Sequence, residues 1–226
     1  MHSFQTIVRL ASVALIVSSS IQAAPTSNTV RSAPQLSCQN DAQEVNGQLY
    51  AGDYYYGSGS TKLGYKSVTD ASGKEELQVV KYDENDTTIR LLDNVIRRQC
   101  NSTALNMYSN QGKFATNSPV KILADVGRDG IPYCVGLSDP AGNPSDIALV
   151  PCSFVDDDSQ ANQFWVSQWK YANLYPAVGK SNKTDDVDNY QPIKPPADDA
   201  NPAVYTTEPA CESCNPYATY NSFYIP

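Results

Sequence analysis

Short runs of alternating apolar and polar residues, separated by turn-forming residues, dominate the chain between Gly47 and Lys170. Val, Ile, Tyr and Thr are frequent in these runs, of which ELQVVKY, PVKILADV, DIALVPC and QFWVSQW are examples. A period of two places alternate side chains on opposite faces of a sheet, and these residue types favour strands. No window carries apolar residues at i, i+3, i+4 and i+7 over a helical length, although TTIRLLDNVIRR comes nearest. We therefore predict an all-β fold.

The strand-rich span is long enough for one sizeable hydrophobic core. A span of roughly 130 residues buries one core and not two, so the strands are expected to close into a single barrel or sandwich. After Tyr171 the composition changes to Pro, Asp, Asn and Tyr, with few branched apolar residues. Such a segment buries too little surface to offset the entropy of ordering it. We therefore predict a disordered tail over residues 172–226, and a short polar leader over residues 24–37.

The N-terminus has the features of a secretory signal. Arg9 precedes the apolar run Leu10–Val17, and small residues follow as far as Ala23, so residues 1–23 are predicted to be removed. The apolar run is shorter than the ~20 residues that span a bilayer, and no other stretch approaches that length. The sequence therefore predicts a secreted, extracellular protein without a membrane anchor.

The charge and the histidine content exclude several classes of function. Removal of the signal leaves 15 basic and 24 acidic residues, a net charge of −9, which disfavours a nucleic-acid partner. The sole histidine, His2, lies in the signal, so the mature chain lacks imidazole for a catalytic triad or a metal site. Two carboxylates suffice for glycoside hydrolysis, but no Asp or Glu pair is singled out by its spacing. We expect a monomer that is not an enzyme and holds no cofactor.

The turn Asp156–Asp158 is the most acidic short run of the strand-rich span. Three successive side chains diverge, and the run lacks the alternating ligands of a calcium loop. A solvated turn is the preferred interpretation, and no metal site is predicted.

All six cysteines lie after the predicted signal, and three sequons accompany them. An even number of cysteines in a secreted chain favours disulfides, although counting alone allows 15 connectivities. The sequons predict glycosylation in a eukaryotic secretory route, at Asn85, Asn101 and Asn182.

The stretch CVGLSDPAGNPSDIALVPCSFVDDDSQANQFW, from Cys134 to Trp165, has a distinctive arrangement. One cysteine opens a strand, a second closes the hairpin, and Gln-x-Trp follows. This unit resembles the ricin-type lectin repeat. NGQLYAGD and RRQCNSTALNMYS extend the resemblance to secreted ricin B-like proteins of basidiomycete fungi. The resemblance implies a β-trefoil over residues 38–171, built from three lobes of about 40 residues each.

The resemblance also implies a disulfide between Cys134 and Cys152. A bridge that closes a loop of this size stabilises a fold by about 3 kcal/mol in the chain-entropy model. With that pair assigned, Cys38 is expected to pair with Cys100. The remaining C-x-x-C, Cys211-Glu212-Ser213-Cys214, lacks the βαβ context of a redox motif and the four ligands of a zinc site. A local disulfide in the tail is preferred, and the alternative is intermolecular pairing or cross-pairing with another cysteine.

In the ricin-type site an Asp, an Asn-Gln pair and an aromatic residue hold the sugar. Asn162 and Gln163 match the amide pair, whereas Gly136 and Val150 stand where the Asp and the aromatic residue are expected. Loss of the carboxylate removes charge-assisted hydrogen bonds worth about 1.5 to 3 kcal/mol each. The resemblance therefore implies a degenerate sugar site in the third lobe. An alternative is that Gln163 bonds to backbone there instead.

Aromatic residues supply the remaining candidates. Trp165 is expected in the core, because it is large and ends a strand. Trp169 is a candidate stacking platform, as is Tyr55, since successive tyrosines of Tyr54–Tyr56 must face opposite sides of a strand. An ordinary amphipathic strand is the alternative for these tyrosines.

Three functions are consistent with these features. The first is a secreted, non-catalytic ricin B-like module that binds carbohydrate. The second is a protein-interaction module, an inhibitor or an effector, that uses trefoil loops on an extracellular protein. The third is a cell-wall or matrix component with a cross-linked tail. We prefer the first because sugar binding is the commonest use of the fold, which is an argument from analogy.

Overall fold

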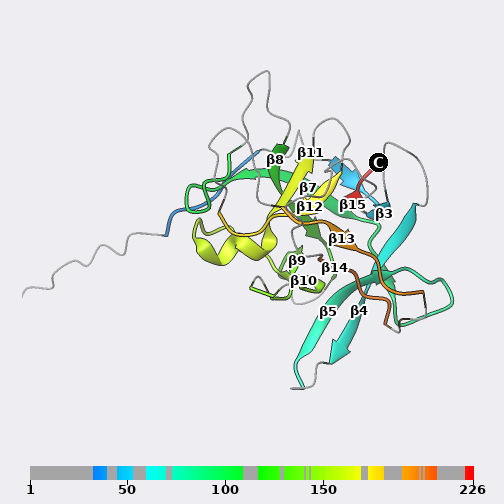
Figure 1. Cartoon of the computed structure of the whole chain (residues 1–226). Coiled ribbons are helices and arrows are strands. Elements are labelled where there is room, and N and C mark those ends of the chain that lie inside the picture. Colours follow the sequence, from blue (N-terminus) through cyan, green and yellow to red (C-terminus); the bar gives the residue numbers. More distant parts are fainter. Residues whose placement is uncertain are drawn as a thin grey trace, which may run out of the picture. The chain divides into compact units, whose positions relative to one another are not determined.

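The computed structural model of the chain describes residues 33–39, 45–52, 60–69, 73–108, 117–127, 130–139, 141–142, 144–168, 173–180, 190–198, 200, 202–207 and 222–226. The described residues form strands and a short 3-10 helix, η2, which confirms the all-β prediction (Figure 1). Their bounds are β1 (Ser37–Cys38), β2 (Val45–Gly47), β3 (Tyr50–Gly52), β4 (Thr61–Thr69), β5 (Glu75–Lys81), β6 (Arg90–Leu91), β7 (Val95–Asn101), β8 (Asn117–Ala124), β9 (Tyr133–Leu137), β10 (Ile147–Pro151), η2 (Asp158–Gln163), β11 (Trp165–Gln168), β12 (Leu174–Pro176), β13 (Ile193–Lys194), β14 (Thr206–Thr207) and β15 (Ser222–Tyr224). Among the described residues, no helix is long and apolar enough to cross a membrane.

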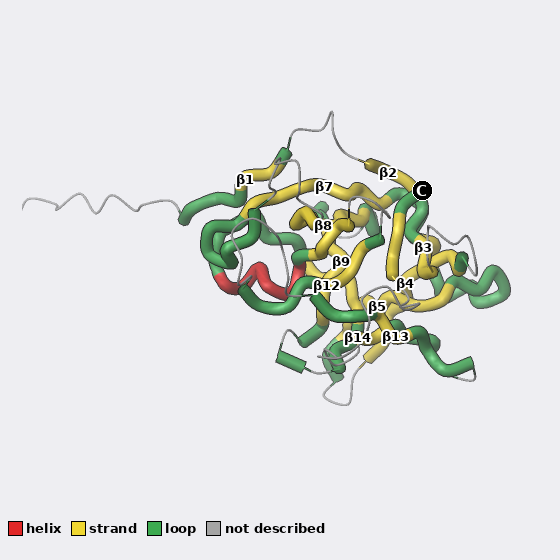
Figure 2. Tube along the Cα trace, turned by 45° about the horizontal axis from the view of Figure 1, so that its top comes forward, coloured by secondary structure: helices red, strands yellow, loops and turns green. Residues whose placement is uncertain are grey.

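The main sheet closes on itself. Strands β8, β11, β12, β15, β3, β4, β5, β10 and β9 pair in that order, and β9 pairs back to β8. Both closing contacts use the same edge of β8, because Asn117–Val120 pairs with β11 while Leu123 and Ala124 pair with β9. Strand β7 occupies the other edge of β8 and carries β1 and β2, and Figure 2 shows β1 lying beside β7. A closed circuit of antiparallel strands leaves few unpaired sheet edges.

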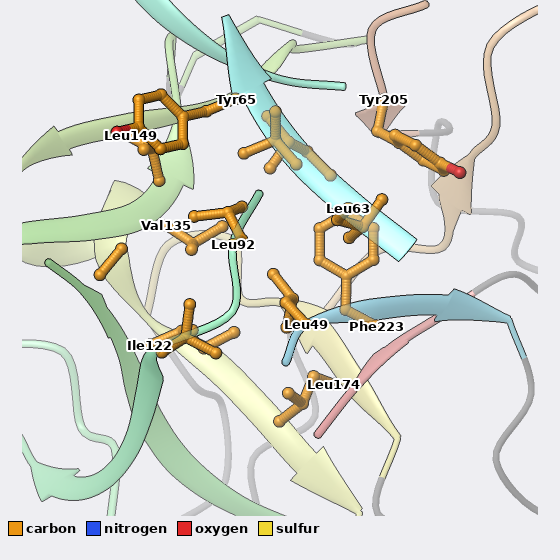
Figure 3. Close-up of a cluster of buried hydrophobic side chains, with 14 of the residues drawn as sticks. Leu49, Leu63, Tyr65, Leu92, Ile122, Val135, Leu149, Leu174, Tyr205 and Phe223 are labelled. Carbon is orange, nitrogen blue, oxygen red and sulfur yellow. The ribbon is translucent and has the colours of Figure 1, made fainter. Parts of the chain in front are cut away.

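The principal core lies inside this circuit. Leu49, Leu63, Leu174 and Phe223 come from different parts of the chain and gather in the interior (Figure 3). Trp165 is fully buried among them, stacks on Phe223 with 5.4 Å between ring centroids, and donates its indole N–H to Val135 O at 2.7 Å. A buried indole needs such an acceptor. The prediction that Trp165 is a core residue is confirmed.

A second apolar cluster lies on the opposite face of β11. Phe164 and Val166, the neighbours of Trp165, point into it. Strand β11 is therefore buried on both faces. The other buried members of the second cluster are Leu36, Cys100, Leu105, Met107 and Ala177.

Two disulfides connect strands of the fold. Cys134 at the start of β9 joins Cys152 just after β10, with 5.0 Å between Cα atoms. Cys38 of β1 joins Cys100 of β7, with 4.0 Å between Cα atoms. Both predicted bridges are confirmed, and they are compatible with an extracellular protein. The predicted signal and the pair Cys211 and Cys214 lie outside the described residues.

The prediction of a disordered tail is wrong for the described parts of residues 172–226. Strand β12 pairs with β11, and β15 lies between β12 and β3 in the main circuit. Ile193, Tyr205 and Phe223 are buried in the principal core, while β13 and β14 pair with each other, as Figure 2 shows. The segment is polar on average, but several of its isolated apolar residues, among them Leu174, Ile193 and Phe223, fill places in the core.

Candidate functional site

The amide pair predicted to hold a sugar is occupied by the protein itself. Gln163 is 5% exposed, and its Oε1 accepts from Lys121 Nζ at 2.9 Å and from Ser153 N at 3.0 Å. Its Nε2 donates to Pro151 O at 3.0 Å. Asn162 Nδ2 donates to Leu137 O at 3.2 Å, while its Oδ1 is buried without a partner among the described residues. Gln163 therefore bonds across the hairpin, as the alternative interpretation expected, and does not form an open sugar clamp.

Gly136, which stands where the resemblance expects an Asp, has no room for a side chain. A Cβ at this position would lie 2.4 Å from the backbone oxygen of Asn162 and 3.2 Å from a methyl group of Val150. No side chain fits without a backbone shift, because real Cβ contacts with backbone are longer. The segment that carries Asn162 is thus packed directly onto β9 at Gly136.

The other predicted site residues fall into two groups. Trp169, Tyr55 and Asn182 lie outside the described residues. Asn85 is exposed in the turn between β5 and β6, and Asn101 is half-buried at the end of β7.

A buried lysine holds the Cys134–Trp165 unit together, and sequence reasoning did not identify it. Lys121 of β8 is 0% exposed, and its Nζ donates to Ser153 O at 2.6 Å, to Gln163 Oε1 and to Gln160 Oε1. The rings of Phe154 and Phe164 flank the ammonium at 5.4 and 5.2 Å. Burial lowers the pKa of Lys121 to about 7. Since three acceptors use all three of its N–H groups, this lysine clamps the hairpin to β8.

The first open depression, which we call the inner hollow, extends from the core toward the tip of the β4–β5 hairpin. Tyr65 and Leu77 form its floor together with Val126, and its volume is about 420 Å³. Register places Ser67 opposite Leu77 and Thr69 opposite Glu75, so one face of the hairpin lines the hollow. The complete lining is Tyr65, Ser67, Glu75, Leu77, Thr88, Arg90, Val126 and Gly127.

Glycines set the walls of the inner hollow. A Cβ on Gly64 would lie 2.6 Å from Arg90 O, so only glycine lets β6 approach β4 and place Arg90 opposite Tyr65. Gly127 has φ of +59° and its N–H donates to Asp125 Oδ1 at 2.9 Å, which fixes the turn after β8. The close approach at Gly64 and the turn at Gly127 bring Arg90 and Val126 to the hairpin.

Polar groups surround the apolar floor of the inner hollow. Ser67 Oγ donates to Glu75 Oε1 at 2.6 Å, and Thr88 Oγ1 donates to Asp86 Oδ1 at 2.6 Å. Arg90 is exposed and makes no ion pair with any residue that the structure describes. The hollow therefore offers an aromatic and aliphatic floor with a hydroxyl, a carboxylate and a free guanidinium around it.

The second depression, the outer groove, lies on the other face of the same hairpin. Lys62 and Lys66 alternate with Leu63 and Tyr65 along β4 and so point away from the core. The groove has a volume of about 750 Å³ and is closed by the turn after β5 and by the segment around Pro202. Its lining is Lys62, Lys66, Val80, Lys81, Tyr82, Asp83, Glu84, Asn85, Asp86, Ile89, Asp198, Ala200, Pro202 and Ala203.

Asp86 connects the two depressions. Its Oδ1 accepts from Thr88 N at 2.9 Å and from the Thr88 hydroxyl, while Lys66 Nζ donates to its Oδ2 at 3.1 Å. The hydrogen bonds from Thr88, together with the Lys66 ammonium, lower the pKa of Asp86 to about 2. Asp86 is therefore ionised at physiological pH and holds the turn between β5 and β6 against β4.

One carboxylate has a pKa shifted in the direction that general acids use. Burial, and then the nearby charge of Glu76, raise the pKa of Asp146, and Gln78 Nε2 donates to its Oδ2 at 3.1 Å. Asp146 lines neither the inner hollow nor the outer groove. Asp146 lies directly before β10 and accepts from Gln78 of β5, which is the position of a cross-strand contact. Within the described ranges, no three His, Cys, Asp or Glu side chains cluster as metal ligands would.

Comparison of the chain with protein-family models, with curated proteins and with solved structures finds no match.

Proposed function

We propose that the protein is a secreted, non-catalytic ricin B-like module with a β-trefoil fold, and that it binds carbohydrate in the inner hollow. The hollow, and not the amide pair of the third lobe, carries the proposal. Its single supporting observation is the free Arg90 guanidinium beside a floor made by Tyr65. Fold-level resemblance adds only an analogy.

The lining of the inner hollow matches what a sugar ring presents. A pyranose has an apolar face of C–H groups and an edge of hydroxyls, so it needs an aromatic surface and nearby donors and acceptors. Tyr65 provides the ring, Arg90 provides donors, and Glu75 provides an acceptor whose other bond fixes it to Ser67. A volume of about 420 Å³ is in the range of small-ligand sites.

Two features support the trefoil part of the proposal. The Cys134–Cys152 hairpin followed by a buried Trp165 has the arrangement that the ricin-type repeat implies. The strands also form a closed antiparallel circuit around one core, which a three-lobed barrel requires.

A glycan array covering plant, fungal and animal glycans tests the function, followed by calorimetric titration with each glycan that binds. We expect Arg90→Gln to weaken binding at least tenfold, because a charged hydrogen bond contributes about 1.5 to 3 kcal/mol. Lys194→Gln is the matched control, since Lys194 is an exposed cation of β13 away from the hollow. Binding to no glycan above background would refute the proposal.

The second candidate is a protein-interaction module, an inhibitor or an effector. The closed packing at Gly136 and Gln163 favours it, because it removes the sugar site that the resemblance implies. Pull-down from host extracellular fluid tests this candidate. Recovery of one protein in stoichiometric amount, with no glycan binding, would support it over the carbohydrate proposal.

A further inference from the structure

Asn85 is the predicted sequon residue that lines a depression in the described structure. It lies in the turn after β5, is exposed, and contributes to the wall of the outer groove. Its Nδ2 donates one hydrogen bond to Asp83 Oδ1 at 3.1 Å. The same oxygen accepts a second hydrogen bond from the backbone N–H of Asn85 at 2.9 Å. These bonds fix the amide at the rim of the groove. The second hydrogen on Nδ2 has no partner within the described residues and is free to be replaced.

The groove is suited to a neutral, hydroxyl-rich occupant. Lys62, Lys81, Glu84 and Asp198 line it and form no hydrogen bond or ion pair to any described residue through their side chains. Charges of both signs therefore face the same space without neutralising one another in pairs. Sugar hydroxyls and acetamido groups donate and accept together, so they satisfy such a mixture, whereas an ion of either sign is repelled by part of it. Tyr82 adds a half-buried ring.

We propose that the first sugars of an N-linked glycan on Asn85 occupy the outer groove and bind the turn between β5 and β6 to the segment 198–203. The proposal requires the predicted secretory route and does not depend on sugar binding in the inner hollow. In the attachment step, the Asn85 amide nitrogen displaces a lipid-linked pyrophosphate from the anomeric carbon of an oligosaccharide donor. A C–N bond forms, the anomeric C–O bond breaks, and the amide loses one proton.

Backbone contacts already join the described residues beside Asp198 to the hairpin. Lys81 N donates to Ala203 O at 3.1 Å, and Val204 forms an isolated bridge with Val80. Sugars that contact Asp198 on one wall and Lys62 on the other would add hydrogen bonds between these parts of the chain. The glycan would then slow local opening of the segment that leads to Tyr205 in the core.

Hydrogen exchange of the full-length secreted protein tests this inference. The wild type and Thr87→Ser retain the sequon, Thr87→Ala removes it without touching Asn85, and Asn182→Gln removes another sequon as the control. Mass spectrometry first measures glycan occupancy at Asn85. We expect amides 198–204 to exchange at least fivefold faster in Thr87→Ala than in the other three proteins.

A second comparison separates a bound glycan from one that projects into solvent. Asp198→Asn is measured with the sequon intact and again with Thr87→Ala. We expect the substitution to speed exchange of 198–204 only when the glycan is present. An unoccupied Asn85 in a glycosylating host, or equal exchange in the wild type and Thr87→Ala, would overturn the inference. Neither result bears on glycan-array binding by the inner hollow, so the two proposals fail separately.

Discussion

The Nζ of Lys121 donates to Oε1 of Gln163 at 2.9 Å, and this bond joins strand β8 to the end of helix η2. The same Gln163 oxygen also accepts from Ser153 N, so one side chain connects three segments. The residue pair that resembles half of a sugar site is thus part of an internal polar network. Within the described residues, one donor of this network, Gln160 Nε2, is buried without an acceptor, while the Lys121 and Gln163 groups are paired.

Replacing Lys121 with methionine should destabilise the fold. Met fills a similar apolar volume, but Ser153 O, Gln160 Oε1 and Gln163 Oε1 each lose a donor. We expect a loss of about 2 to 4 kcal/mol in the free energy of unfolding, measured by urea denaturation. Lys194→Met, at an exposed position, should change it by less than about 0.5 kcal/mol. Equal stability of the Lys121 and Lys194 variants would contradict the clamp.

The buried ammonium also predicts how stability depends on pH. Burial lowers the pKa of Lys121 from 10.5 to about 7, so between these pH values the unfolded chain binds more protons than the folded one. The free energy of unfolding attributable to this group therefore increases as pH rises from about 7 toward 10.5, by up to about 1.4 kcal/mol per pH unit. Urea denaturation between pH 7.5 and 9.5 should show a shallower rise in Lys121→Met than in the wild type. Parallel curves would contradict the prediction.

Restoring the carboxylate of a ricin-type site at Gly136 should fail. In Gly136→Asp the new Cβ would lie 2.4 Å from Asn162 O, which forces a backbone shift. We expect a loss of at least about 2 kcal/mol in stability and no gain in galactose affinity by calorimetric titration. Ala141→Asp, at an exposed position of the same hairpin, is the control. Tighter galactose binding by Gly136→Asp would show that the Cys134–Trp165 unit opens to a ligand.

Sequence periodicity predicted the strands well because local alternation determines which face of a strand is buried. The start of the β4 run TKLGYKSVT shows this, with Leu63 and Tyr65 buried and Lys62 between Thr61 and Leu63 exposed. Lys121 is an exception to this alternation, because it is a charged residue in a strand that is buried at nearly all its positions. Its polar partners are 32 to 42 residues away in sequence, and no local pattern indicates them.

The inner hollow could not be found from a motif. Tyr65, Arg90 and Val126 are far apart in the sequence and meet only because Gly64 lets β6 pack on β4 and the turn at Gly127 follows β8. The only sequence signal was an isolated glycine within an otherwise regular strand, which is typical of a close backbone approach. The amide pair was more visible in sequence because its spacing relative to Cys152 and Trp165 is local.

The C-terminal strand should be essential to the fold although its surroundings in the sequence are polar. Phe223 is fully buried, stacks on Trp165 and meets Tyr205 edge-on with 5.5 Å between ring centroids. Phe223→Ala should cost about 3 to 5 kcal/mol in the free energy of unfolding, as expected for a buried aromatic ring whose space the neighbours cannot fill. Pro226→Ala, at the exposed end of the same segment, is the control and should be neutral in urea denaturation. A Phe223→Ala protein as stable as the control would show that β15 does not belong to the closed circuit. Truncating a side chain in a solvated tail changes neither the core nor the strand pairing, and so leaves the free energy of unfolding unchanged.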